Sequence, residues 1–259
     1  MISTTIITDI FVFVFGLLIG SFLNAVIYRL PREISIVYPR SACPHCKKTI
    51  YWYENIPVIS FLFLRGRCSG CAGSISWRYP AIELAMGIIA FLLFPAPLTT
   101  TSLVDFIFLF SVACVFVVHF FVDLDYQILP DGLNLYLAIV FFGISWPTHP
   151  WTHWLLGGLL GFFFPLAVAW VFYKLRGQIG LGGGDIKLYG ALGLYLGPLG
   201  VMYNIFLSCL LGSVVGVTFI ALKKMERNNP IPFGPFILIT AAIQIYFSKA
   251  FDAFSSFLF

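Results

Sequence analysis

The sequence predicts an all-α polytopic membrane protein with about eight transmembrane helices and a small cytosolic zinc-knuckle domain. Of its 259 residues, 60% are hydrophobic and 10% are charged, whereas a soluble domain carries about a quarter charged residues. The mean hydropathy is +0.96. Four cysteines in two CxxC pairs lie in the one strongly charged stretch, which indicates a folded aqueous domain. The predicted domains are a first transmembrane helix (1–28), the four-cysteine domain (29–79) and a multi-helix membrane domain (80–259).

The first apolar run, residues 6–27, is long enough to cross a bilayer, since about 20 residues span the hydrocarbon core. No Lys or Arg precedes Arg29, so the positive region of a cleavable signal peptide is missing. Seven more spans are predicted near 80–96, 101–122, 132–147, 151–173, 185–198, 200–222 and 235–258. Three GxxxG spacings allow close helix packing: Gly16/Gly20, Gly157/Gly161 and Gly193/Gly197.

Basic residues are distributed asymmetrically around these spans. If the N-terminus lies outside, the four-cysteine domain faces the cytosol with Arg29, Arg32, Arg40, Lys47, Lys48, Arg65, Arg67 and Arg78. The inner ends of later spans add Lys174, Arg176, Lys223, Lys224 and Arg227. The outer loops at 95–101 and 147–150 contain no Lys or Arg. The positive-inside rule therefore predicts outside N and C termini and a cytosolic four-cysteine domain.

The cysteine spacing predicts a metal site. Cys43 and Cys46 form one pair and Cys68 and Cys71 the other, with 21 residues between the pairs. Cytosolic thiols stay reduced, so metal binding is favoured over a disulfide. Four thiolates fill a tetrahedral zinc shell and leave no position for water, which predicts a structural zinc ion. A redox protein is the alternative, and it would need exposed thiols that cycle.

The histidine inside the first cysteine pair and the two cysteines outside the pairs are assigned surface or packing roles. His45 is expected on the surface, and Cys114 and Cys209 are expected to be buried thiols. Glu54 and Asn55 stay open between binding a ligand and holding the small domain together.

Four aspartates gather at predicted cytosolic helix ends. Asp123, Asp125 and Asp131 lie between the third and fourth spans, and Asp185 opens the sixth. Carboxylates near a bilayer are costly and mark functional sites. Asp123 ends an apolar span and Asp185 follows three glycines, so these two are the candidate functional residues of the group. Asp131 is predicted to cap a helix after Pro130, and Asp125 to be solvated.

Paired carboxylates suit amide hydrolysis, because one takes a proton from water while the other polarises the scissile carbonyl. Such a pair titrates as a unit. Gly182, Gly183 and Gly184 precede the second aspartate. Without side chains there, an extended substrate backbone can approach the carboxylate. His119, one helical turn before Asp123, is expected to serve packing.

The chain resembles bacterial type IV prepilin peptidases, the GxGD class of intramembrane aspartyl proteases that also serve type II secretion. The resemblance covers nearly the whole chain and rests on several segments. They are residues 20–31 (GSFLNAVIYRLP), 41–46 (SACPHC), 52–57 (WYENIP), 64–71 (LRGRCSGC), 78–84 (RYPAIEL), the Asp-x6-Pro-Asp pattern at 123–131, Gly-x-Gly-Asp at 182–185 and 232–235 (PFGP).

The resemblance implies that Asp123 and Asp185 cleave prepilins or pseudopilins. The substrate would carry a short basic leader, cut after a Gly at the cytosolic face of the bacterial inner membrane. It also implies N-methylation of the new N-terminal residue with S-adenosylmethionine. Beyond substrate and membrane lipid, no nucleic-acid partner is expected.

Two other functions remain open. A proton-coupled transporter also carries intramembrane aspartates and glycine-broken helices. It predicts acidic residues at the bilayer midplane and inverted repeats, and no internal repeat is visible. A non-catalytic pilin-binding membrane protein would tolerate the loss of both carboxylates.

Overall fold

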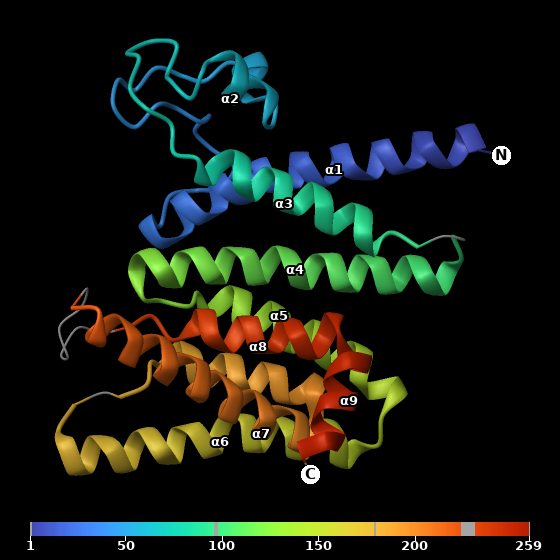
Figure 1. Ribbon diagram of the computed structural model, residues 1–259, viewed down its shortest axis with the longest axis vertical. Coiled ribbons are helices and arrows are strands. Elements are labelled where there is room, and N and C mark those ends of the chain that lie inside the picture. The colour runs from blue at the N-terminus through green and yellow to red at the C-terminus, as the bar shows by residue number, and fades with distance from the viewer. Residues whose placement is uncertain (1, 96–97, 179, 224–230, 259) are drawn as a thin grey trace. The chain divides into compact units, whose positions relative to one another are not determined.

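The computed structural model describes residues 2–95, 98–178, 180–223 and 231–258 (Figure 1). Within these residues the regular structure is helical, and pairing of extended segments is limited to two isolated bridges, Ala42–Thr49 and Arg67–Ser74. The all-helical prediction is therefore confirmed. Lys224 and Arg227 lie outside the described residues. The chain divides into two compact units, Met1–Val118 and His119–Phe259.

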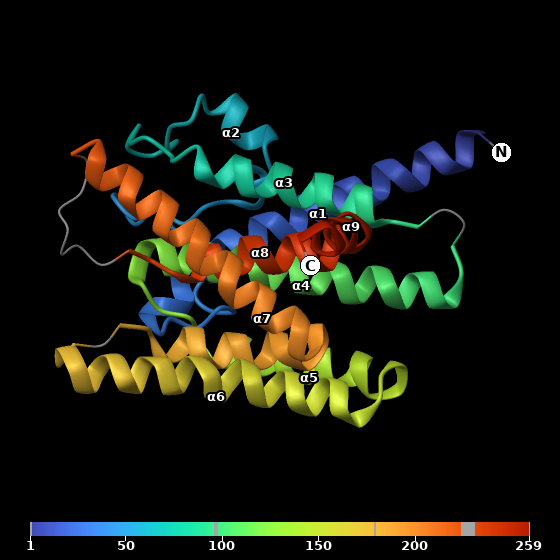
Figure 2. The same cartoon turned by 60° about the horizontal axis from the view of Figure 1, so that its bottom comes forward.

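In the first unit, α1 (Ile2–Arg29) packs along α3 (Arg78–Leu93), as Figures 1 and 2 both show. The contact depends on small residues, as the first GxxxG spacing predicted. A Cβ added to Gly16 would lie 2.5 Å from the Met86 carbonyl oxygen, and one added to Gly20 would lie 2.6 Å from the Glu83 Cα. Both glycines therefore let the two backbones approach closely.

The segment between these helices forms the four-cysteine domain. It contains two short 3₁₀ helices, Leu30–Arg32 and Trp52–Asn55, and the five-residue helix α2 (Ile59–Phe63). Glu83, a buried residue of α3, accepts a hydrogen bond at 2.8 Å from the amide of Val58 in this domain. Arg29, at the end of α1, donates to the carbonyls of Ser35 at 3.0 Å and Pro39 at 2.7 Å. These bonds attach the polar domain to its two helices.

The helix α4 (Thr100–Tyr126) begins in the first unit and ends in the second. In its described residues, the second unit continues with five helices. They are α5 (Asp131–Thr148), α6 (Trp151–Arg176), α7 (Gly183–Ala221), α8 (Gly234–Tyr246) and α9 (Ser248–Leu258). The contact between α6 and α7 again uses glycine: a Cβ added to Gly157 would lie 2.1 Å from the Gly193 carbonyl oxygen.

The helix α7 folds back on itself at Gly197. The backbone there has φ 71° and ψ −178°, and Pro198 follows, so only glycine fits without strain. Tyr189 Oη lies 2.6 Å from Ser208 Oγ, although a straight helix would separate their Cα atoms by about 28 Å. The reversal is visible in Figure 2. The predicted stretches at 185–198 and 200–222 correspond to the two arms.

Four helical segments in the described residues are long and apolar enough to cross a membrane: Ile6–Arg32, Thr100–Tyr126, Trp151–Arg176 and Gly183–Ala221. Eight spans stay a prediction. The expectation of one helix over 235–258 is wrong. The chain leaves helical geometry at Phe247 (φ −122°, ψ 38°), and α9 turns away from α8 (Figure 1). Ser248 and Lys249 interrupt the apolar sequence at this point.

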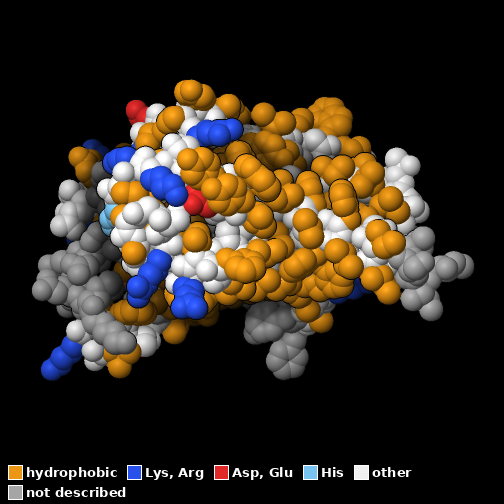
Figure 3. All heavy atoms as spheres, turned by 90° about the horizontal axis from the view of Figure 1, so that it is seen from above, with side chains coloured by type: hydrophobic (Ala, Val, Ile, Leu, Met, Phe, Trp, Pro, Cys, Tyr) orange, Lys and Arg blue, Asp and Glu red, His pale blue; other side chains and the backbone are white. Residues whose placement is uncertain are grey.

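The surface agrees with a membrane protein. On the face drawn in Figure 3, hydrophobic side chains cover most of the area, while Lys and Arg side chains gather toward one end. Exposed hydrophobic side chains on this scale are typical of a lipid-facing surface.

Candidate active site and metal site

The two CxxC turns have the same backbone geometry. In the first, the Cys43 amide donates to the Lys48 carbonyl at 2.9 Å and the Lys47 amide donates to the Cys43 carbonyl at 2.9 Å. The second repeats this pattern, from Cys68 to Gly73 at 2.8 Å and from Ala72 to Cys68 at 2.9 Å. Lys47 and Ala72 occupy equivalent left-handed positions, with φ 60° and 56°. Each turn therefore directs two thiols to the same side.

The four sulfur atoms converge. Cys43 Sγ lies 3.9 Å from Cys71 Sγ, and Cys46 Sγ lies 3.9 Å from Cys68 Sγ. All four lie within 4.8 Å of one another. Tetrahedral zinc with Zn–S bonds of 2.3 Å requires sulfur separations of about 3.8 Å. The site fits a four-thiolate metal ion, and His45 is exposed and outside this group, as predicted.

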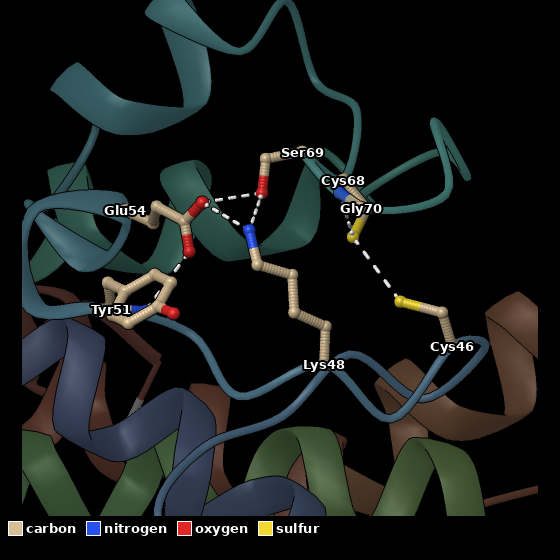
Figure 4. Close-up of polar contacts among 7 residues, drawn as sticks. All are labelled: Cys46, Lys48, Tyr51, Glu54, Cys68, Ser69 and Gly70. Atoms are coloured by element: carbon tan, nitrogen blue, oxygen red, sulfur yellow. Dashed lines mark hydrogen bonds and ion pairs between the residues drawn. The ribbon is translucent and has the colours of Figure 1, made fainter.

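A polar bridge connects the two turns (Figure 4). Glu54 Oε1 accepts hydrogen bonds from Lys48 Nζ at 2.9 Å and from the Ser69 hydroxyl, and Lys48 Nζ also donates to Ser69 Oγ at 2.7 Å. Glu54 Oε2 accepts from the Tyr51 amide at 3.0 Å. Lys48 follows the first cysteine pair and Ser69 lies within the second. Of the two alternatives for Glu54, these contacts favour the structural one.

The polar bridge favours the ionised form of the Glu54 carboxylate. The Ser69 hydroxyl, the Tyr51 amide and the Lys48 ammonium together lower the pKa of Glu54 to about 2, in that order of effect. The hydrogen bond to Glu54 raises the pKa of Lys48. Both groups are therefore charged at neutral pH, and the bridge is intact under the conditions in which the thiols bind metal.

Asp123 is buried near the end of α4, where its Oδ2 accepts the Gly234 amide at 2.9 Å. Gly234 is the first residue of α8. A Cβ added to it would lie 2.8 Å from this same oxygen. Position 234 therefore requires glycine if the carboxylate is to stay in place.

Asp185 is buried in the first turn of α7. Its Oδ2 accepts the Gly182 amide at 3.3 Å, and its Oδ1 is buried with no hydrogen-bond partner in the described part of the chain. The preceding glycines differ from one another. A Cβ on Gly184 would lie 2.9 Å from Leu129 Cβ, whereas Gly183 has nothing within 4 Å of that position. Gly183 thus fits the predicted open approach, and Gly184 is required by packing.

The structure brings Asp123 and Asp185 together. They interact electrostatically, and Leu129 packs against both Gly184 and Gly234, the neighbours of the two carboxylates. Both aspartates lie at helix ends, which does not match the midplane position expected for a transporter.

The other two aspartates of the group lie outside this pair. Asp125 and Asp131 are exposed, and Asp131 forms an ion pair with Lys187 at 2.7 Å. The predicted capping role of Asp131 is wrong: Pro130 occupies the cap position, Asp131 is the first residue of α5, and no side chain caps this helix. Proline fixes the backbone dihedral there, and the carboxylate of Asp131 turns to the Lys187 ammonium.

Three site residues were not predicted: Gly234, Leu129 and Asn134. The Asn134 side-chain amide donates to the Gly184 carbonyl at 3.3 Å and so holds the turn before Asp185. The sequence analysis quoted the segments that contain Gly234 (PFGP) and Leu129 (123–131), but no spacing rule reveals that they meet across the fold. His119 is fully buried, and both of its ring nitrogens lack a hydrogen-bond partner within the described residues, so its packing role stays a prediction.

Two family models match the chain. The Bacterial Peptidase A24 N-terminal domain matches residues 14–96 and the Type IV leader peptidase family matches residues 107–217. Among curated proteins, the chain is similar to three called prepilin leader peptidase/N-methyltransferase. That of Aeromonas salmonicida (strain A449) is 35% identical over 90% of this chain and 89% of its own length. That of Bacillus subtilis (strain 168) is 32% identical over 93% of this chain and 95% of its own length. That of Pseudomonas aeruginosa (strain PAO1) is also 32% identical, over 89% of this chain and 87% of its own length. No solved structure matches the chain.

Proposed function

The chain belongs to the type IV leader peptidase family, and we propose that it cleaves the leader of type IV prepilins or pseudopilins with Asp123 and Asp185 as its catalytic pair. One observation carries this assignment: two buried carboxylates from helices far apart in sequence interact, while Asp125 and Asp131 are exposed. The leader is cut after a Gly at the cytosolic membrane face.

The pair performs hydrolysis as an acid and a base. One ionised carboxylate takes a proton from water as the water oxygen attacks the scissile carbonyl carbon, and the protonated partner donates to the carbonyl oxygen. Two neighbouring buried carboxyl groups do not both ionise readily, so one of the pair is suited to act as the acid and the other as the base. The open position at Gly183 gives an extended peptide access to Asp185.

The second activity is N-methylation of the new N-terminal residue, with S-adenosylmethionine as methyl donor. The support is the name shared by the relatives and the match of their N-terminal domain to residues 14–96, a range that contains the four-cysteine domain.

Zinc is the metal that Cys43, Cys46, Cys68 and Cys71 would hold. Four thiolates leave no open coordination position, so a bound zinc ion would stabilise the domain and would activate no water. The domain is small, and a metal commonly supplies stability that such a core lacks.

The proposed location is the bacterial inner membrane, as a multi-pass protein with outside N and C termini and a cytosolic zinc domain. The charge distribution supports this orientation. In this proposed orientation, the ends of α4 and α7 that carry Asp123 and Asp185 would face the cytosol, where the leader of a prepilin is accessible.

Cleavage of a model prepilin by the full chain in detergent tests the proposal. Asp123→Asn and Asp185→Asn are each expected to lower kcat by at least about 10²-fold, with thermal unfolding unchanged. Asp125→Asn, two residues along the same helix, is the matched control and should keep the wild-type rate. Wild-type activity in either of the first two variants would remove that residue from the pair. A wild type that cuts no prepilin would favour the non-catalytic pilin-binding function.

A further inference from the structure

The two carboxylates of the pair are held differently. Asp123 accepts the Gly234 amide at 2.9 Å. That amide belongs to the first residue of the 13-residue helix α8, so the helix itself provides no acceptor for it. The amides at a helix N-terminus also carry partial positive charge. The contact therefore favours the ionised form of Asp123.

Asp185 has weaker support for a negative charge. Its one hydrogen bond, from the Gly182 amide, is 3.3 Å long, and its Oδ1 is buried without a donor within the described residues. Asn134, which holds the preceding turn, also has a buried side-chain oxygen without a donor there. A buried carboxylate oxygen that accepts no hydrogen bond is costly, whereas a protonated carboxyl becomes a donor.

We propose that Asp123 is the ionised base of the pair, that Asp185 is its protonated acid, and that Gly234 is the positioning residue that sets this division. This assignment rests on the proposed peptidase function. In the forward step, Asp123 takes a proton from water, the water oxygen bonds to the carbonyl carbon, and Asp185 gives its proton to the carbonyl oxygen. On collapse, Asp123 returns its proton to the leaving amine and Asp185 regains one from a hydroxyl of the intermediate as the C–N bond breaks.

The charged surroundings agree with this division. Asp185 of α7 lies near Asp123, and a negative charge on Asp123 would oppose ionisation of Asp185. Lys187 pairs with the exposed Asp131. On α4 itself, His119 lies one turn before Asp123, fully buried and with both ring nitrogens unpaired in the described residues. Among the described residues, the Gly234 amide, at the partially positive N-terminus of α8, is the hydrogen-bond donor that the structure gives to Asp123.

Gly234→Ala is the first test, because the new methyl carbon would lie 2.8 Å from Asp123 Oδ2 and 3.1 Å from its Cγ. The carboxylate must move, and a displacement of this kind lowers kcat by about 10²-fold. Losing a hydrogen bond that favours the ionised form should also move the acid limb of the kcat/KM profile to higher pH. Gly143→Ala is the matched control, since it adds a methyl to a helical glycine with nothing within 4 Å.

An acid limb at the wild-type pH in an impaired Gly234→Ala enzyme would overturn the proposal, as would an unchanged rate. A purely structural role would lower the rate or the Tm without moving this limb. The Tm reports whether the variant is folded, and the KM for the prepilin reports whether its interaction with substrate has changed.

If Gly234→Ala fails to fold, a second comparison tests the proposal. At the acid position an asparagine still donates an N–H to the carbonyl oxygen, whereas at the base position it accepts no proton. The Asp185→Asn enzyme should therefore be at least about tenfold more active than the Asp123→Asn enzyme. The reverse order, or equal losses in both, would overturn the assignment while leaving the peptidase pair intact. Full activity in both would instead refute the proposed function.

Discussion

Tyr189 and Ser208 meet across the reversal of α7, with 2.6 Å between Tyr189 Oη and Ser208 Oγ, and both side chains are buried. Ser208 Oγ also donates to the Asn204 carbonyl at 2.7 Å. In the neighbouring turn, the Asn204 side-chain amide donates to Gln244 Oε1 of α8 at 2.8 Å. Polar side chains thus fasten the two arms of α7 to each other and to α8 inside an apolar bundle. The first arm carries Asp185, so this fastening supports the proposed site.

Removing the Ser208 hydroxyl should destabilise the protein. Ser208→Ala leaves the Tyr189 hydroxyl buried without its partner, at an expected cost of about 1–2 kcal/mol. The Tm in detergent measures the effect, and Thr218→Ala is the control, since Thr218 is exposed on the same helix and bonds only its own turn. Tyr189→Phe added to Ser208→Ala should recover part of the loss. Equal Tm values for Ser208→Ala and Thr218→Ala would contradict this account of the reversal.

The α6–α7 contact should not tolerate a methyl group at Gly157. Gly157→Ala would place Cβ 2.1 Å from the Gly193 carbonyl oxygen and 2.8 Å from the Gly197 Cα. Backbone atoms cannot rotate away, so the helices must separate, and we expect a Tm clearly below that of Gly143→Ala. Because α7 carries Asp185, prepilin cleavage should fall with it. A Gly157→Ala protein as stable as the Gly143→Ala control would show that this contact is looser than described.

The four-cysteine site should hold one zinc ion per chain. Elemental analysis of the purified full chain is expected to find zinc in the wild type and to lose it in Cys46→Ser or Cys68→Ser. Cys114→Ser is the control, because Cys114 lies on α4, away from the cluster. Thiolates must be deprotonated to bind metal, so acidification should release the ion. Zinc retained in both Cys46→Ser and Cys68→Ser would place the metal elsewhere.

Glu54→Gln should loosen the contact between the two cysteine turns in a pH-dependent way. The lowered pKa of Glu54, about 2 against an ordinary 4.5, means that its ionised form stabilises the fold. That contribution is complete above about pH 4.5 and is lost as the pH falls toward 2. Limited proteolysis of the domain should therefore distinguish Glu54→Gln from wild type equally at pH 7 and 5, and less below 4.5.

The control for this experiment is Glu33→Gln, since Glu33 is exposed in the same domain and takes no part in the bridge. It should match the wild type at every pH. A difference between Glu54→Gln and wild type that grows below pH 4.5 would contradict the sign of the effect.

Features that depend on local residue order were readable from the sequence. Composition determined the helical membrane class, since long apolar runs must satisfy their backbone groups within a helix. The CxxC spacing predicted the cysteine cluster, because each pair forms its own turn and only two turns must meet. The packing at Gly16 and Gly20 followed in the same way from a one-helix spacing.

Contacts between distant segments were decided by the tertiary structure. The reversal at Gly197 and the break at Phe247 depend on what packs around them. The length of the apolar run at 235–258 therefore predicted one helix where the structure has two. The sequence singled out Asp123 and Asp185 as unusual acidic residues near a membrane. Their meeting, the Gly234 amide that holds one of them and the Leu129 that packs beside both arise from segments far apart in the chain. No local pattern encodes such contacts, because their geometry exists only after the helices have packed.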